Sequence, residues 1–77
     1  MNAIELTKQL MSKTNMTYRD LAHFAELGTV SNLHQMLSRK DLKVSTFIKM
    51  LDAMGYQLIV QDTSGLDEEY VLDGEEE

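Results

Sequence analysis

The feature that most constrains the fold is a set of three short segments between residues 17 and 54 whose apolar side chains recur every three or four residues. Such spacing places the apolar side chains on one face of an α-helix. Gly28 and Thr29 separate the first two segments, so the connection there is a tight turn. We therefore expect a helix, a turn, a second helix, a loop and a third helix. The inward positions are Tyr18, Leu21, Ala22 and Ala25, then Val30, Leu33, Met36 and Leu37, then Phe47, Ile48, Leu51 and Met54.

Residues that favour helix ends flank these three segments. They also flank an additional helical segment that precedes residue 17. Asn2 is a suitable N-cap for a first helix that runs to about Lys13, and residues 14–15 end it. Thr17 and Asp20 have the spacing of a capping box, in which each side chain binds a backbone N–H of the other residue. The other expected ends are Gly28 and Gly55 as C-terminal glycines, and Thr29 and Ser45 as N-caps.

The chain after Gly55 has a different pattern. Residues 56–61 are rich in β-forming residues and alternate in part, which predicts a strand. Residues 62–65 are a turn or a linker, and residues 69–72 either pair back on the strand as a hairpin or stay disordered. The expected class is mainly α: a small bundle of four to five helices followed by a C-terminal β-strand or hairpin. A domain at 1–61 and an acidic tail at 62–77 follow.

The net charge of −6 is unevenly distributed along the chain. Residues 1–61 contain seven Lys or Arg and five Asp or Glu, whereas residues 62–77 contain eight acidic residues and no Lys or Arg. The protein is therefore a mildly basic body with a strongly acidic tail, and the body is compatible with nucleic acid as a partner.

Size and composition exclude several classes. A 77-residue chain buries about 60% of its unfolded surface and, without cysteine, has no disulfide or thiolate zinc site, so dimerisation is the remaining support. No apolar stretch reaches the roughly 18 residues of a membrane span and the N-terminus does not resemble a signal peptide, so we expect a cytoplasmic protein without a membrane partner. The chain has no Gly-rich phosphate loop and no spacing typical of a catalytic triad, so we do not expect an enzyme. His23 and His34 lie eleven residues apart without metal-site spacing, and no metal or cofactor is expected.

Three of these segments resemble the lambda-repressor/Cro-like helix-turn-helix family, also called Xre-like, over roughly residues 4–60. Residues 16–22 (Met-Thr-Tyr-Arg-Asp-Leu-Ala) are similar to the entry into the family's second helix, residues 33–37 to the buried side of its recognition helix, and residues 45–56 to its closing helix and glycine stop. The chain departs from the family at Glu26, where glycine is usual, and before Ser45, where the family's common proline is missing. The resemblance implies a DNA-binding homodimer with its recognition helix at about residues 29–38.

A helix-turn-helix presents its second helix to the DNA major groove, and this predicts the contact residues. Asn and Gln pair bidentately with adenine and Ser is an adaptable donor and acceptor, so base contacts are expected from the outward face of the third helix. These residues are Ser31, Asn32 and Gln35, with Val30 against a thymine methyl group and Thr29 at the helix start. Phosphate contacts are expected from Thr17, Tyr18, Arg19, Arg39, Lys40 and Lys43. An ordinary solvated helix face is the alternative explanation for the same residues.

The strand after Gly55 is similar to a strand that contributes to the dimer in antitoxin members of the family. An unpaired strand edge favours pairing with a second copy, so the expected dimer residues are Tyr56, Leu58, Ile59 and Val60.

These features favour a sequence-specific transcriptional regulator, most simply a repressor, that binds palindromic DNA as a homodimer. A first alternative is an antitoxin that represses its own operon and binds a toxin, and a second is a protein-interaction module that does not bind DNA. Whichever function holds, three explanations are open for the acidic tail: a disordered terminus, an electrostatic competitor for the basic surface, or a docking segment. Its apolar anchors in the last case are Leu66, Tyr70, Val71 and Leu72.

Overall fold

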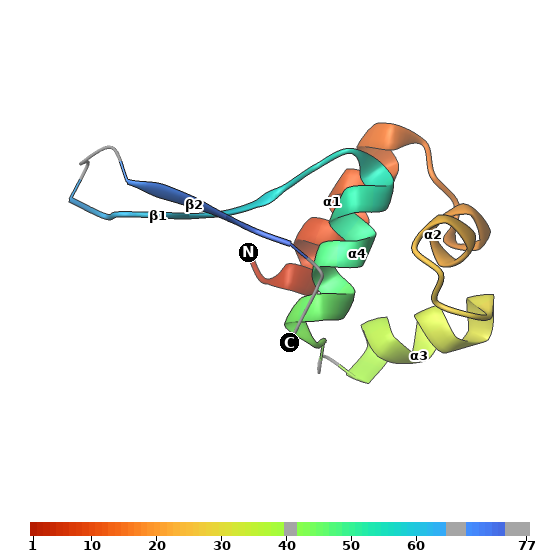
Figure 1. The fold of residues 1–77 in the computed structure, drawn as a ribbon. Helices are drawn as coiled ribbons and strands as arrows, with labels where there is room; N and C mark the ends of the chain where they lie inside the picture. The colour runs from red at the N-terminus through yellow and green to blue at the C-terminus, as the bar shows by residue number, and fades with distance from the viewer. Residues whose placement is uncertain (40–41, 65–67, 74–77) are drawn as a thin grey trace.

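Four α-helices are followed by a two-stranded antiparallel sheet in the computed structural model, which describes residues 1–39, 42–64 and 68–73 (Figure 1). The order is α1 (Ala3–Thr14), α2 (Tyr18–Phe24), α3 (Val30–Arg39), α4 (Val44–Met54), β1 (Leu58–Gln61) and β2 (Glu69–Leu72). This confirms a mainly helical chain with a C-terminal hairpin. No helix among the described residues is long and apolar enough to cross a membrane.

Three helices begin at the side-chain caps that the sequence predicts. The Asn2 side chain accepts a hydrogen bond from the Glu5 N–H at 2.8 Å, and the Thr17 hydroxyl accepts one from the Asp20 N–H at 3.0 Å. In both cases the acidic side chain accepts a hydrogen bond from the backbone N–H of the cap residue, which completes a capping box. The Thr29 hydroxyl accepts from the Asn32 N–H at 3.1 Å, so Thr29 caps α3.

The prediction that Ser45 caps the fourth helix is wrong. Helix α4 begins at Val44, and Lys43 occupies the N-cap position with extended backbone and no side-chain cap bond. Ser45 is already the second helical residue, so its hydroxyl is not at the position from which a cap reaches the first free N–H groups.

Helices α1, α2 and α4 end in the same way, with one residue in the left-handed conformation. These residues are Asn15 (φ 58°), Glu26 (φ 57°) and Gly55 (φ 86°). After each of them the next residue donates its N–H to a carbonyl five residues back, as in Leu27 to Ala22 at 2.9 Å. The expectation that Gly28 ends the second helix is therefore wrong: α2 ends at Phe24 and Glu26 makes the reversal, while Gly28, also at positive φ (88°), shapes the turn that follows.

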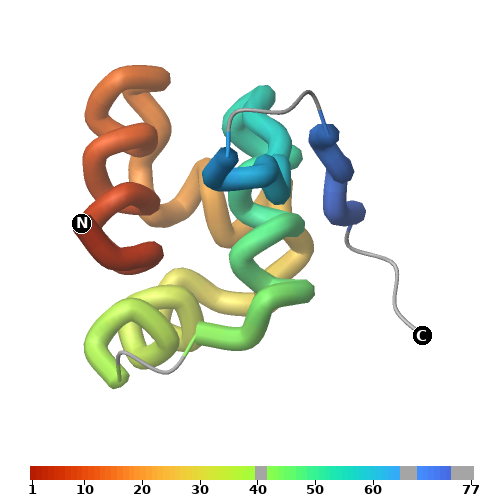
Figure 2. Tube along the Cα trace, turned by 90° about the vertical axis from the view of Figure 1, so that its left-hand side faces the viewer, coloured from red at the N-terminus to blue at the C-terminus, as the bar shows by residue number. Residues whose placement is uncertain are grey.

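The core is formed by the inward faces of all four helices. Helix α1 lies beside α4, and α2 packs against both α3 and α4 (Figures 1 and 2). Most predicted inward positions are buried, while Tyr18, Val30, Met36 and Phe47 are half-buried. Met50 is fully buried although the predicted stripe on α4 omits it. The buried apolar residues are Leu10, Met11, Leu21, Ala22, Ala25, Leu33, Leu37, Ile48, Met50, Leu51 and Met54, and Thr7 is buried as well.

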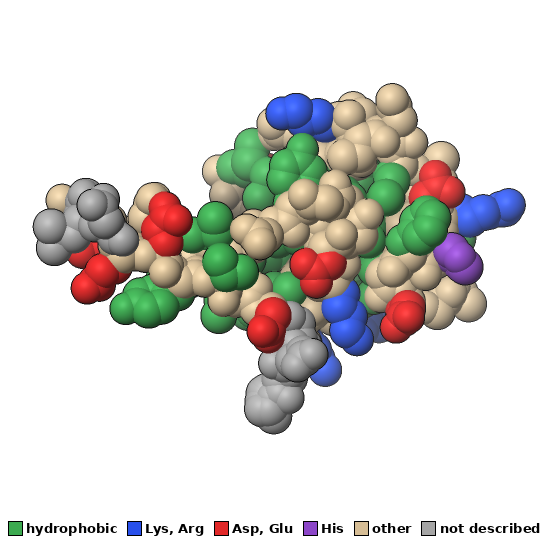
Figure 3. All heavy atoms as spheres, turned by 45° about the horizontal axis from the view of Figure 1, so that its top comes forward, with side chains coloured by type: hydrophobic (Ala, Val, Ile, Leu, Met, Phe, Trp, Pro, Cys, Tyr) green, Lys and Arg blue, Asp and Glu red, His purple; other side chains and the backbone are tan. Residues whose placement is uncertain are grey.

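Residues 69–72 form a strand that pairs back on β1 as a hairpin. The hairpin extends away from the helices (Figure 1). Strand β1 begins two residues later than predicted and pairs with β2 in the register Leu58 to Leu72, Ile59 to Val71, Val60 to Tyr70 and Gln61 to Glu69. Because directly opposite residues point to the same side of a sheet, Leu58, Val60, Tyr70 and Leu72 share one entirely apolar face. Apolar side chains lie along the hairpin with acidic side chains between them (Figure 3).

Candidate nucleic-acid interface

Helix α3 presents a face that is polar along its whole length. Leu33 and Leu37 turn inward and are buried, with exposed fractions of 0% and 5%. The opposite side carries exposed side chains with hydrogen-bonding groups, as the helical periodicity predicts. They are Ser31, Asn32, His34, Gln35, Ser38 and Arg39.

The connection between α2 and α3 covers residues 25–29, which is longer than the predicted two-residue turn. Leu27 is held through both of its backbone groups: its N–H donates to the Ala22 carbonyl, and its carbonyl accepts from the Asn32 side-chain amide at 2.8 Å. The first turn of α3 is thus tied to the end of α2. Among Ser31, Asn32 and Gln35, Asn32 is the one whose side chain makes a hydrogen bond within the described chain.

The start of α2 contacts the middle of α3 through two rings. The Tyr18 and His34 ring centroids lie 4.2 Å apart at an angle of 43°. Tyr18 is half-buried and also packs against the core, whereas the neighbouring Arg19 is exposed. Thr17 is exposed as well, but its hydroxyl accepts the cap hydrogen bond of α2. Three residues here are expected to contact phosphate, and Arg19 is the one that carries a charge. Its side chain is exposed and makes no hydrogen bond to the described residues.

The remaining predicted contact residues surround α3. Ser31 and Gln35 are exposed one helical turn apart, Val30 is half-buried, and Thr29 acts as the cap of α3. Arg39 ends α3 and Lys43 precedes α4, and both are exposed. Lys40 lies outside the described residues.

The predicted dimer residues divide into two pairs. Tyr56 and Leu58 are half-buried and pack against the core, whereas Ile59 and Val60 are 45% and 49% exposed. Strand β2 adds Tyr70, Val71 and Leu72, which are 62%, 56% and 41% exposed. Leu66, the other expected anchor of the tail, lies outside the described residues.

The hairpin turn holds one carboxylate with a shifted pKa. The Ser64 N–H donates to the Asp62 carboxylate at 2.9 Å, and this bond, with a second from the Ser64 hydroxyl, lowers the pKa of Asp62 below its usual value of 3.8. Gln61 and Glu69 are also joined across the strands by a side-chain bond of 2.9 Å. These contacts support the turn and lie on a different element from α3.

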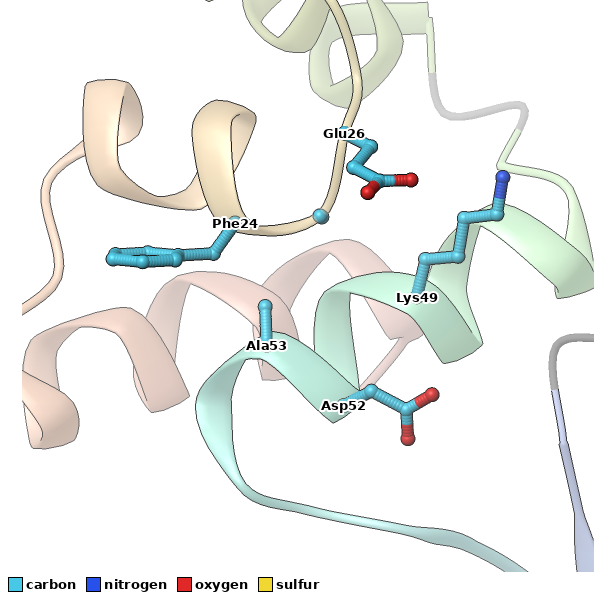
Figure 4. Close-up of a pocket in the computed structure, with 6 residues that line it drawn as sticks. Phe24, Glu26, Lys49, Asp52 and Ala53 are labelled. Carbon is cyan, nitrogen blue, oxygen red and sulfur yellow. The ribbon is translucent and has the colours of Figure 1, made fainter.

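A hollow of about 260 Å³ lies between the end of α2 and α4 (Figure 4). Ala25 and Ala53 contribute small apolar groups, and Glu26, Lys49 and Asp52 contribute charges. Phe24, which is 60% exposed and carries no predicted role, completes the lining. Its ring and that of the exposed His23 meet in a T-shaped arrangement, with centroids 5.2 Å apart. No group of three or more His, Asp or Glu side chains in the described residues could hold a metal ion.

Comparison of the chain with protein-family models, curated proteins and solved structures found no match. The geometry of α2, α3 and the hairpin is therefore the basis on which a function is inferred.

Proposed function

We propose that the protein is a sequence-specific DNA-binding transcriptional regulator of the lambda-repressor-like helix-turn-helix type, with α3 as its recognition helix. The observation that carries this proposal is the division of α3 into a buried apolar side and an exposed polar side, on a helix anchored to α2 by a short connection. An α-helix fits the major groove, and side chains such as Gln35 and Ser31 supply the donors and acceptors that read base edges.

The exposed cations beside α3 suit phosphate contacts. Arg19 at the start of α2, Arg39 at the end of α3 and Lys43 before α4 are exposed, and Lys40 follows Arg39 in the sequence. If all four neutralise phosphates of duplex DNA, the logarithm of the binding constant should fall with the logarithm of salt concentration with a slope of about −4 per protomer. The acidic residues after Lys49 oppose nonspecific binding and make specific contacts more important.

A homodimer is part of the proposal, and the hairpin is its interface. A two-stranded hairpin is marginally stable by itself, and this one exposes apolar side chains on both faces. Pairing with a second copy through the face that carries Val60 and Tyr70 would cover these two exposed side chains. Ile59 and Val71 lie on the opposite face, and Tyr56 and Leu58 already contact their own core. Val60→Lys is expected to give a monomer in sedimentation, with the exposed Gln57→Lys as the matched control. A Val60→Lys protein that stays dimeric would place the interface elsewhere.

Fluorescence anisotropy of the full-length protein tests DNA binding. The probes are DNA from directly upstream of its own gene and a scrambled duplex of the same composition, titrated from low to physiological salt. We expect salt-sensitive binding that prefers the upstream DNA and weakens in Gln35→Ala. Gln9→Ala, an exposed glutamine on α1, is the control that should bind unchanged. Binding that ignores sequence at every salt concentration would contradict the proposal.

The exposed apolar residues of β2 favour one second candidate, an antitoxin that also binds a partner protein through the hairpin. Such a protein would keep the DNA binding of α3 and add a toxin as partner. A DNA-bound protein whose Val71→Ser variant keeps its dimer and DNA affinity but loses a co-encoded small toxin would support it, because Val71 is exposed on the face of the hairpin opposite Val60 and Tyr70. Failure to bind DNA at low salt would instead favour an interaction module on the same fold.

A further inference from the structure

Two side chains on the outward face of α3 are arranged differently although both are amides. The Asn32 amide nitrogen donates to the Leu27 carbonyl at 2.8 Å, while the Gln35 amide has no hydrogen bond to the described chain. Asn32 lies in the first turn of α3, and Gln35 lies one turn further along. The difference matters because both residues belong to the types that pair with adenine.

The bond from Asn32 joins two helices through one peptide unit. Leu27 follows the left-handed Glu26, and its N–H closes the end of α2 on Ala22. Its carbonyl would have no helical partner in the turn, and the Asn32 amide supplies one from α3. The Asn32 backbone N–H is in turn bound to Thr29 at 3.1 Å. Residues 27 to 32 therefore form a bracket that sets how the first turn of α3 leaves the end of α2.

Gly28 suits this bracket through its backbone conformation. The backbone there has φ +88°, which glycine adopts freely, whereas a Cβ at position 28 would lie 4.0 Å from the Asn32 amide nitrogen, an ordinary contact. The ring contact of Tyr18 with His34 adds a second tie between the same helices, two residues further along α3. The Asn32 side chain is exposed, and its bond to the Leu27 carbonyl orients its amide.

We propose that Asn32 is a positioning residue of the recognition helix and that sequence reading on this face falls to Gln35 and Ser31. The inference rests on the proposed function and differs from the expectation that all three side chains read bases. The bracket of residues 27–32 sets the angle at which the whole helix meets the groove. Its loss therefore weakens every base contact together. Loss of a reading side chain affects the base pair that it contacts.

The experiment measures affinity for a site selected from random duplex DNA by the full-length protein, and for all single-base variants of that site. Measurements are made at 10 °C, where circular dichroism checks that each variant is folded. Asn32→Ala and Thr29→Ala are expected to lose affinity about three- to tenfold for all variant sites in the same proportion, with the salt slope unchanged. Gln35→Ala is expected to lose discrimination at one base pair by roughly five- to a hundredfold. Gln9→Ala is the matched surface control.

A nuclear magnetic resonance measurement on the unchanged protein keeps the inference testable if Asn32→Ala does not fold. A scalar coupling from the Asn32 side-chain nitrogen to the Leu27 carbonyl carbon, observed both in the free protein and in the protein bound to DNA, would support the bracket. A coupling that disappears on DNA, or an Asn32→Ala protein that loses preference at a single base pair, would overturn it and leave DNA binding intact. An unchanged protein that selects no site would overturn the proposed function and this inference with it.

Discussion

Replacing Glu26 by glycine is expected to stabilise the protein, because Glu26 adopts a backbone conformation that residues with a Cβ adopt at a cost. Its φ is 57°, in the left-handed region. That conformation costs an L-residue roughly 1–2 kcal/mol, while glycine adopts it freely but loses about 0.5–1 kcal/mol more conformational entropy on folding. The balance predicts a gain of about 0.5–1 kcal/mol in the free energy of unfolding. For a domain of this size the melting temperature should rise by roughly 2–8 °C.

The other two helix ends of the same type show which residues suit this position. Asn15 ends α1 and Gly55 ends α4, and both residue types visit left-handed backbone readily. Among these three helix ends, Glu26 is the one residue whose type rarely adopts left-handed backbone. The Glu26 carboxylate also lies near the negative end of the α2 dipole, which adds a second unfavourable contribution.

Thermal unfolding followed by circular dichroism separates the two contributions. Glu26→Gln removes the charge and keeps the Cβ, so glycine should melt higher than glutamine at equal protein concentration. Gly55→Ala is the reverse change: a Cβ there meets nothing within 4 Å, so the expected loss of about 1 kcal/mol is conformational. If Glu26→Gly melts no higher than Glu26→Gln, the reasoning from backbone strain is refuted.

Three further results are expected from the caps, the core and the hairpin turn. Asn2→Ala should lower the free energy of unfolding by about 1 kcal/mol because it removes the α1 capping box, whereas Ser45→Ala should change it little in the same melts; equal losses would contradict the assignment of the caps. Leu21→Ala should lower it by about 2–5 kcal/mol, because Leu21 is fully buried, and a native-like melting temperature would be inconsistent with that packing. In a carbon-detected titration, Asp62 should ionise below pH 3.8, because the Ser64 N–H and hydroxyl favour the carboxylate. Its contribution to the turn should be complete above that value and be lost as the pH falls through the lower pKa of the folded state, and a midpoint at or above 3.8 would exclude the bond.

Local signals predicted the starts of α1, α2 and α3 and most of the face that each helix buries. Asn2, Thr17 and Thr29 cap because their side chains reach N–H groups only two or three residues away, so spacing along the chain is sufficient information. The apolar stripes were predictable for the same reason. Met50 was missed because α4 contacts both α1 and α2, and a helix covered on two sides buries a wider arc than a surface helix.

Features that depend on the path of the chain in space were not predictable. Glycine is the usual sign of a left-handed helix end, so the sequence indicated Gly28, while the packing of Leu27 and Ala25 brought the reversal to Glu26. The pairing of residues 69–72 depends on a partner strand across the turn, and composition alone left it open. The role of Asn32 depends on where the Leu27 carbonyl points, which no spacing rule gives.

The contact between α1 and α4 determines the order in which this chain can complete its core. Helices α2 and α3 meet through residues close in sequence, so their corner can form while the chain is still being synthesised. Leu10 and Met11 on α1, in contrast, are covered by a helix that starts more than 30 residues later, at Val44. A nascent chain that stops before α4 therefore exposes these side chains to solvent, and we expect such fragments to bind chaperones or aggregate. Pulse proteolysis of ribosome-bound chains should show protection of α1 appearing abruptly once α4 has left the exit tunnel.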